Sequence, residues 1–95
     1  MPLRFEWDPE KARSNAKKHG VSFDEASTAF ADILSLTSAD PLHSKHEDRF
    51  VLIGQSHHGR LIVVVHTEQE DRIRIISARA ATGKERRYYE EDAKR

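Results

Sequence analysis

The sequence contains no cysteine among its 95 residues. This absence excludes a disulfide scaffold, a thiolate zinc site and a cysteine nucleophile, and it fits a reducing compartment. Long apolar runs are also missing, because the longest, residues 61–65, falls far short of the ~20 residues of a membrane span. The first ten residues, MPLRFEWDPE, include no apolar signal segment. We therefore expect a cytoplasmic protein.

A net charge of zero conceals an uneven distribution of charge. Residues 72–95 contain eight basic and four acidic side chains, whereas the rest of the chain contains eight basic and twelve acidic ones. The C-terminal quarter therefore carries the positive surplus. A chain of 95 residues forms one domain, and we expect a surface site because the chain is too short for a deep cofactor chamber.

The first third of the sequence predicts a short strand over residues 3–7 and then a helix. Asp8 suits the N-cap and Pro9 the first helical position, where its missing N–H is not needed. This helix runs to about Lys18 and ends at Gly20, which suits the left-handed position after a helix. Its apolar face is thin, and its outer surface is basic.

A second helix is predicted by the capping box of Ser22 and Glu25, in which the hydroxyl and the carboxylate satisfy free N–H groups. Its apolar stripe, which we expect to cover the sheet, follows the 3.6-residue period at Phe23, Ala26, Ser27, Phe30 and Ile33. Residues 33–37 then read as a strand. The polar loop of residues 38–48 contains His43 and His46, but it lacks a well-placed third zinc ligand, so we predict a solvated loop and no metal site.

Residues 49–56, 60–68 and 72–79 form three predicted strands, and their short connections imply antiparallel neighbours. Residues 61–65 are apolar on both faces, which predicts a central strand covered by the C-terminal helix or by a partner protein. Thr82 and Glu85 form a second capping box and start that helix. The order β-α-α-β-β-β-β-α predicts an α+β fold with a mostly antiparallel sheet, in a single domain over residues 1–95.

The last strand breaks its own alternation, because Ile76 repeats the apolar type of Ile75. A one-residue bulge there would restore the phase. It would place four polar side chains on one face: Arg72, Arg74, Ser77 and Arg79. Such a row of guanidinium groups forms either a ladder of ion pairs or an anion site.

Arginine stays protonated, so another residue must transfer protons. His66 and Glu68 share a face by their spacing and lie next to the arginine strand, and a carboxylate can orient a histidine. The alternative is that His66 caps a strand edge while Glu68 pairs with Arg72 or Arg74. Of Tyr88 and Tyr89, we expect one to pack on the sheet and the other to reach the basic face.

An open arginine face beside a histidine, a carboxylate and a tyrosine suits the cleavage of single-stranded RNA. The 2′-hydroxyl is an internal nucleophile, so the reaction needs no metal ion. A base removes its proton, an acid protonates the leaving 5′-oxygen, and arginine stabilises the developing charge. Such a site requires only a groove.

Two blocks of the sequence, FEWDPEKARSNAKKHGVSFDEA at residues 5–26 and DRIRIISARAATGKERRYYEE at residues 71–91, resemble the BrnT toxins of bacterial type II toxin-antitoxin systems. The resemblance implies a RelE-like fold, ribonuclease activity that arrests translation, and a BrnA antitoxin with a DNA-binding part through which the complex represses its own operon. The family's terminal pattern falls on Ser77, Arg79, Ala80, Glu85 and Tyr89, and its K-H-G-V-x-F element on Lys18, His19, Gly20, Val21 and Phe23.

The sequence therefore predicts a metal-independent endoribonuclease toxin that a BrnA-type antitoxin neutralises in a hetero-oligomer, with a substrate RNA that is free or ribosome-associated. The predicted catalytic residues are Arg74, Arg79, His66, Glu68 and Tyr89. The predicted substrate-binding residues are Arg72, Ser77, Arg60 and Lys18. Two alternatives use the same surfaces: a nucleic-acid-binding module without catalysis, and a pure protein-interaction partner.

Overall fold

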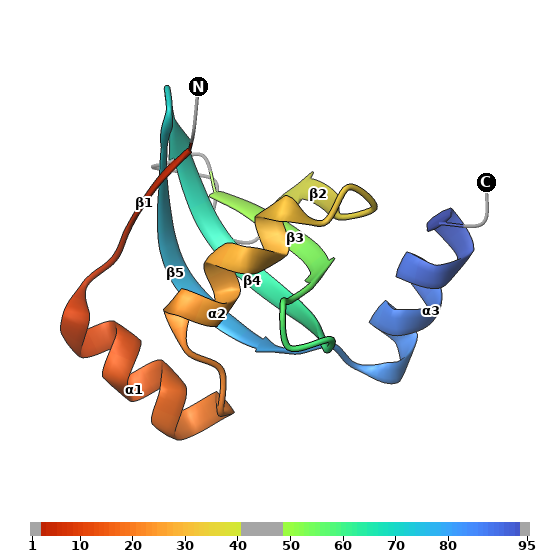
Figure 1. The fold of residues 1–95 in the computed structure, drawn as a ribbon, viewed down its shortest axis with the longest axis horizontal. Coiled ribbons are helices and arrows are strands. Elements are labelled where there is room, and N and C mark those ends of the chain that lie inside the picture. Colours follow the sequence, from red (N-terminus) through yellow and green to blue (C-terminus); the bar gives the residue numbers. More distant parts are fainter. Residues whose placement is uncertain (1–2, 41–48, 94–95) are drawn as a thin grey trace.

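The computed structural model describes residues 3–40 and 49–93. The fold is mixed α+β, with one five-stranded sheet and three α-helices (Figure 1). Its elements are β1 (Arg4–Glu6), α1 (Pro9–His19), α2 (Phe23–Thr28), the short 3-10 helix η1 (Ala29–Ala31), β2 (Leu36–Ala39), β3 (Arg49–Gln55), β4 (Leu61–Gln69), β5 (Arg72–Ala80) and α3 (Gly83–Ala93). His43 and His46, the loop histidines, lie outside the described residues.

The strand order is β1-β5-β4-β3-β2, so β4 is the central strand, as its apolar sequence predicts. β1 pairs with β5 in parallel, and the other neighbours are antiparallel. The main core lies between the sheet and α1 and α2, where Phe23, Ile62 and Val64 are fully or almost fully buried. A smaller core lies on the opposite face, where Tyr89 of α3 packs on Val63. Figure 1 shows α1 and α3 far apart, on opposite sides of the molecule.

The start and end of α1 follow the sequence signals. The Asp8 side chain accepts a hydrogen bond from the backbone N–H of Glu10 at 2.8 Å. Gly20 has φ 70°, and its N–H donates to the carbonyl of Ala16 at 2.8 Å. A residue without Cβ adopts this left-handed conformation at no steric cost. α1 therefore ends at a fixed position, directly after His19.

The second helix ends earlier than its apolar stripe predicts. α2 stops at Thr28, η1 follows, and the chain leaves helical geometry at Asp32. The Asp32 carboxylate accepts the N–H of Leu34 at 2.9 Å, which stabilises a turn. Ile33 is consequently 96% exposed and does not cover the sheet. The strand predicted over residues 33–37 begins only at Leu36.

The bulge predicted in the last strand is confirmed. Val65 of β4 pairs with Ser77, and His66 pairs with Ile75, so Ile76 has no partner in the register. The inserted residue keeps Arg72, Arg74, Ser77 and Arg79 on one face of β5. On the other face, Ile73, Ile75 and Ala78 are buried in the main core.

Candidate functional site

The three arginines of β5 are all paired with carboxylates. Arg74 Nη1 donates to Glu6 Oε2 at 3.1 Å, and Arg72 Nη1 lies 3.8 Å from Glu6 Oε1. Arg79 donates through Nη1 and Nη2 to the two carboxylate oxygens of Glu85, at 2.8 and 2.9 Å. The Arg79 hydrogen bonds lower the pKa of Glu85 to about 2. Between 42% and 56% of each arginine side chain remains exposed, so the row is an ion-pair ladder that solvent still reaches.

A small pocket of about 110 Å³ lies beside Arg72 and Arg74, at the N-terminal end of this row. Its walls include Arg72, Arg74, Thr67 and the carboxylate of Glu6. Arg74 hydrogen bonds to Glu6 through Nη1 alone, and a guanidinium has five N–H donors. Arg74 can therefore hold a second anion while its ion pair stays intact, although the Glu6 charge opposes that anion.

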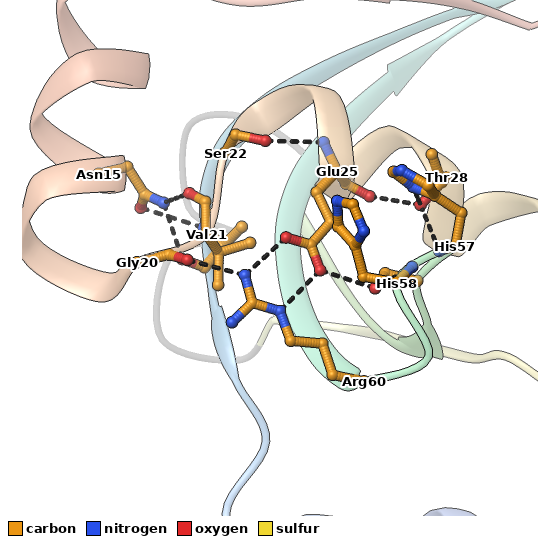
Figure 2. Close-up of polar contacts among 11 residues, drawn as sticks. Asn15, Gly20, Val21, Ser22, Glu25, Thr28, His57, His58 and Arg60 are labelled. Carbon is orange, nitrogen blue, oxygen red and sulfur yellow. Dashed lines mark hydrogen bonds and ion pairs between the residues drawn. The ribbon is translucent and has the colours of Figure 1, made fainter.

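Arg60 belongs to a different network, shown in Figure 2. Its Nε and Nη2 donate to the two carboxylate oxygens of Glu25 at 2.7 and 2.6 Å, and Nη2 also donates to the carbonyl of Gly20 at 2.7 Å. The Ser56 hydroxyl donates to Glu25 Oε2 at 2.7 Å. Glu25 is 3% exposed, and the Arg60 hydrogen bonds lower its pKa to about 2. Arg60 thus joins the end of α1 to α2 and to the start of β4.

The first capping box is consequently only half formed. Ser22 Oγ accepts the N–H of Glu25 at 3.0 Å, as predicted, but the Glu25 carboxylate turns to Arg60. The second box is complete: Thr82 N–H donates to Glu85 Oε1 at 2.8 Å, and Glu85 N–H donates to Thr82 Oγ1 at 3.2 Å. Glu85 therefore caps α3 and binds Arg79 at once.

His66 and Glu68 share a face, and their side chains are 2.8 Å apart between Nε2 and Oε2. His66 is completely buried, with its ring 4.8 Å from that of Phe30 and 5.9 Å from that of Phe50. Its Nδ1 has no hydrogen-bond partner among the described residues. Because His66 is paired in register with Ile75, a residue of the main core, it lies on the core face of the sheet, against Phe30 of η1.

The sheet therefore separates His66 and Glu68 from the arginine face, and the structure does not bring the predicted catalytic set together. The spacing of two residues fixes which side chains share a face of one strand, but the register decides which face of the next strand they join. The predicted alternative also differs from the structure, because Glu6, and not Glu68, pairs with Arg72 and Arg74.

One of the two tyrosines packs on the sheet, as predicted, and the other is exposed. Tyr88 is 59% exposed, whereas Tyr89 is 9% exposed and donates its hydroxyl to Asp32 Oδ2 at 2.6 Å. Burial and this hydrogen bond raise the pKa of Tyr89 to about 12. Tyr89, which the sequence assigns to substrate positioning, is thus the residue that anchors α3 to the turn after η1.

A groove of about 230 Å³ lies between α1 and the bulged segment of β5. It brings together Lys18 and Ser77, two of the predicted substrate-binding residues, and adds Lys11, Ser14 and His19. None of the described residues that line this groove is a carboxylate. Within the part of the chain that the structure describes, the side chains of Lys11, Lys18 and His19 have no ion pair or hydrogen bond. Among the described residues, cations without a carboxylate partner therefore line this groove, whereas the three arginines of β5 are paired.

Asn15 also lines this groove, although it is not among the site residues predicted from the sequence. Its Nδ2 donates to the carbonyls of Val21 and Ala78 at 2.9 and 2.8 Å, and its Oδ1 accepts the N–H of Ala78 at 3.1 Å. β1 pairs with β5 only as far as Arg74, so Asn15 satisfies the strand edge beyond that point. The sequence signal that could have indicated Asn15 is its spacing of three residues from Ala12, which places both on the thin apolar face of α1.

The described residues contain no group of three histidine or carboxylate side chains that could hold a metal ion. None of the helices they form is both long and apolar enough to span a membrane.

The sequence matches one protein family over most of its length. The family described as "Ribonuclease toxin, BrnT, of type II toxin-antitoxin system" matches residues 7–85. The chain is similar in structure to the ribonuclease toxin BrnT of Brucella abortus, with a TM-score of 0.61 and 23% identity over 84% of this chain and 97% of that one, a likeness that shows the fold alone. No curated protein matches significantly. The family match confirms the resemblance seen in the sequence: the chain belongs to the BrnT family of ribonuclease toxins of type II toxin-antitoxin systems.

Proposed function

We propose that the chain is an endoribonuclease toxin that cleaves RNA by attack of the 2′-hydroxyl, without a metal ion, and thereby inhibits translation in the cytoplasm. The observation that carries this proposal is the groove between α1 and β5, with its unpaired lysines and its lack of carboxylates. A positive groove that follows the backbone is the common feature of proteins that bind single-stranded nucleic acid.

The RNA path that we propose follows β5. Ser77 belongs both to the groove and to the arginine face, so the two surfaces are continuous at the bulge. A strand rises about 3.3 Å per residue, so the row from Arg72 to Arg79 is roughly 20 Å long. In this arrangement, Lys18 and Ser77 bind the phosphate in the groove, while Arg74 and Arg79 bind its neighbours through donors that their ion pairs leave exposed.

His66, Glu68 and Tyr89 have no contact with RNA in this proposal. His66 and Glu68 support the core beneath η1, since His66 is fully buried and bonded to Glu68. Tyr89 positions α3 through Asp32, and so keeps Glu85 beside Arg79. Arg60 acts through the backbone, because its bond to the Gly20 carbonyl fixes the end of α1 next to the groove.

We further propose that the partner is a BrnA-type antitoxin, with which the toxin represses its own operon. The fold in this proposal is RelE-like. Its support is membership of a type II toxin-antitoxin family. On the arginine face, α3 covers Val63, but Val65 and Val51 stay only partly buried, which leaves apolar area for a partner. Co-expression with the antitoxin should restore the growth of cells that produce this chain. Continued arrest would contradict that part of the proposal.

The test of the activity is cleavage of end-labelled RNA of randomised sequence by the purified chain, with and without ribosomes. We expect fragments with 2′,3′-cyclic phosphate and 5′-hydroxyl ends, formed equally well in EDTA. A substrate with 2′-deoxy positions throughout should remain intact, because it lacks the nucleophile. Binding without cleavage would instead favour the nucleic-acid-binding module, and neither binding nor cleavage would favour the interaction partner.

A further inference from the structure

The groove between α1 and β5 contains one side chain that suits proton transfer. Lysine and serine are, as residue types, poor acceptors of a proton near neutral pH. Histidine is the residue type that exchanges a proton most readily in this range. His19 is the histidine that lines the groove, and its neighbours there are Lys11 and Lys18 of α1 and the uncharged Ile76 and Ser77 of β5.

The backbone around His19 is fixed on both sides. Four residues earlier, Asn15 is 8% exposed and bonded to both the N–H and the carbonyl of Ala78. One residue later, the Gly20 N–H donates a hydrogen bond to the carbonyl of Ala16. The Gly20 carbonyl accepts a hydrogen bond from Arg60, as Figure 2 shows. A reactive side chain needs such support, because small errors in position reduce the rate strongly.

The other histidines of the described residues have different surroundings. His66 is sealed in the main core. His57 and His58 lie in the turn between β3 and β4, where His57 Nδ1 is 3.1 Å from Thr28 Oγ1. Neither lines the groove. His19 is thus the described histidine that lies among unpaired cations, where a phosphodiester would be held.

We propose that His19 is the base that activates the 2′-hydroxyl, an assignment that rests on the proposed ribonuclease function. The imidazole takes the 2′-hydroxyl proton, the O2′–P bond forms, and the P–O5′ bond breaks. The leaving 5′-oxygen takes a proton from water, and the imidazolium returns its proton to solvent. Lys11 and Lys18 stabilise the extra negative charge on the phosphorane, as fixed cations do at sites of developing charge.

The test compares His19→Gln with His58→Gln, which removes an exposed histidine outside the groove. Single-turnover cleavage of the randomised RNA is measured from pH 5 to pH 9, with ribosomes if the wild-type chain needs them. The wild-type rate should rise with pH and then level off. We expect the rate of His19→Gln to be lower by about 100-fold or more, which is the usual contribution of a positioned base. The rate of this variant should also no longer depend on pH. His58→Gln should behave as the wild type.

Two further measurements separate proton transfer from a structural role. The affinity for a non-cleavable 2′-O-methyl RNA should be similar in the wild type and in His19→Gln. Added imidazole should restore part of the rate to His19→Ala, because it can enter the space of the missing ring. A His19→Gln chain that cleaves like the wild type would overturn the assignment and leave the ribonuclease proposal standing. A wild-type chain that does not cleave would overturn both.

Discussion

Two carboxylates, Glu25 and Glu85, make the folded chain sensitive to acid. Each accepts two hydrogen bonds from one arginine, and each has a pKa lowered from 4.5 to about 2. A carboxylate whose pKa is lower in the folded state stabilises that state when it is ionised in both states. This contribution is complete above pH 4.5 and disappears as the pH falls through the folded value.

We therefore expect the free energy of unfolding to fall between about pH 4.5 and pH 2, the window that the two lowered pKa values define. Glu25→Gln should make this fall shallower, because a neutral amide does not titrate. Urea titrations at a series of pH values measure the effect. If the variant and the wild type lose stability in parallel as the pH falls, the Arg60 pair does not stabilise the fold in this way.

Tyr89 provides a second test at a single side chain. Its hydroxyl bond to the ionised Asp32 is short and nearly buried. Tyr89→Phe should reduce the free energy of unfolding by about 2 kcal/mol, the usual effect of losing a hydrogen bond to a charged group. Its folded fraction should cleave RNA at the wild-type rate. A stable variant without cleavage would show instead that the hydroxyl takes part in catalysis.

Among the secondary-structure elements, those set by local signals were predictable from the sequence. Asp8 and Gly20 mark the two ends of α1, and Thr82 marks the start of α3. These ends were predictable because each cap involves residues within one helical turn. The bulge at Ile76 was predictable because it interrupts an alternation within one strand. The end of α2 was not predictable, since Asp32 binds residues as distant as Gln55 and Tyr89.

The candidate site was predictable only in part, for a similar reason. The sequence indicated Lys18 and Ser77 separately, but their meeting depends on Asn15, which docks α1 on the edge of β5. It also placed His66 beside the arginines, because both faces of β4 are apolar and the sequence does not fix its register with β5. Long-range packing therefore decides which of the candidate residues share a surface.

The contact between β3 and η1 can be tested with a matched pair of glycines. A Cβ on Gly54 would lie 2.9 Å from the Ala29 carbonyl oxygen and 3.2 Å from Ser35 Cβ, whereas one on Gly83 would meet nothing within 4 Å. Gly54→Ala should destabilise the fold by about 1–3 kcal/mol through overpacking. Gly83→Ala, at the start of α3, should be neutral or stabilising by about 0.5 kcal/mol. Thermal unfolding of both variants measures this difference, and equal stabilities would contradict the packing described.

The molecule as a whole combines a five-stranded sheet with a basic surface whose ion pairing differs along β5. The three arginines of β5 are paired with two carboxylates, Glu6 and Glu85, whereas the lysines of the groove beside α1 have no ion pair among the described residues. A polyanion gains the most electrostatic binding free energy at cations that no carboxylate already pairs. The groove should therefore dominate RNA affinity, although residues 72–95 contain more basic side chains.

The most direct test is the salt dependence of affinity for 2′-O-methyl RNA, measured for Lys18→Ala and Lys17→Ala. Both changes remove one exposed positive charge from the last turn of α1, but only Lys18 lines the groove. Lys18→Ala should weaken binding and lower the slope of log K against log salt by about 1, the effect of one lost phosphate contact. Lys17→Ala should leave both unchanged. Equal losses in the two variants would show that the groove does not hold the RNA.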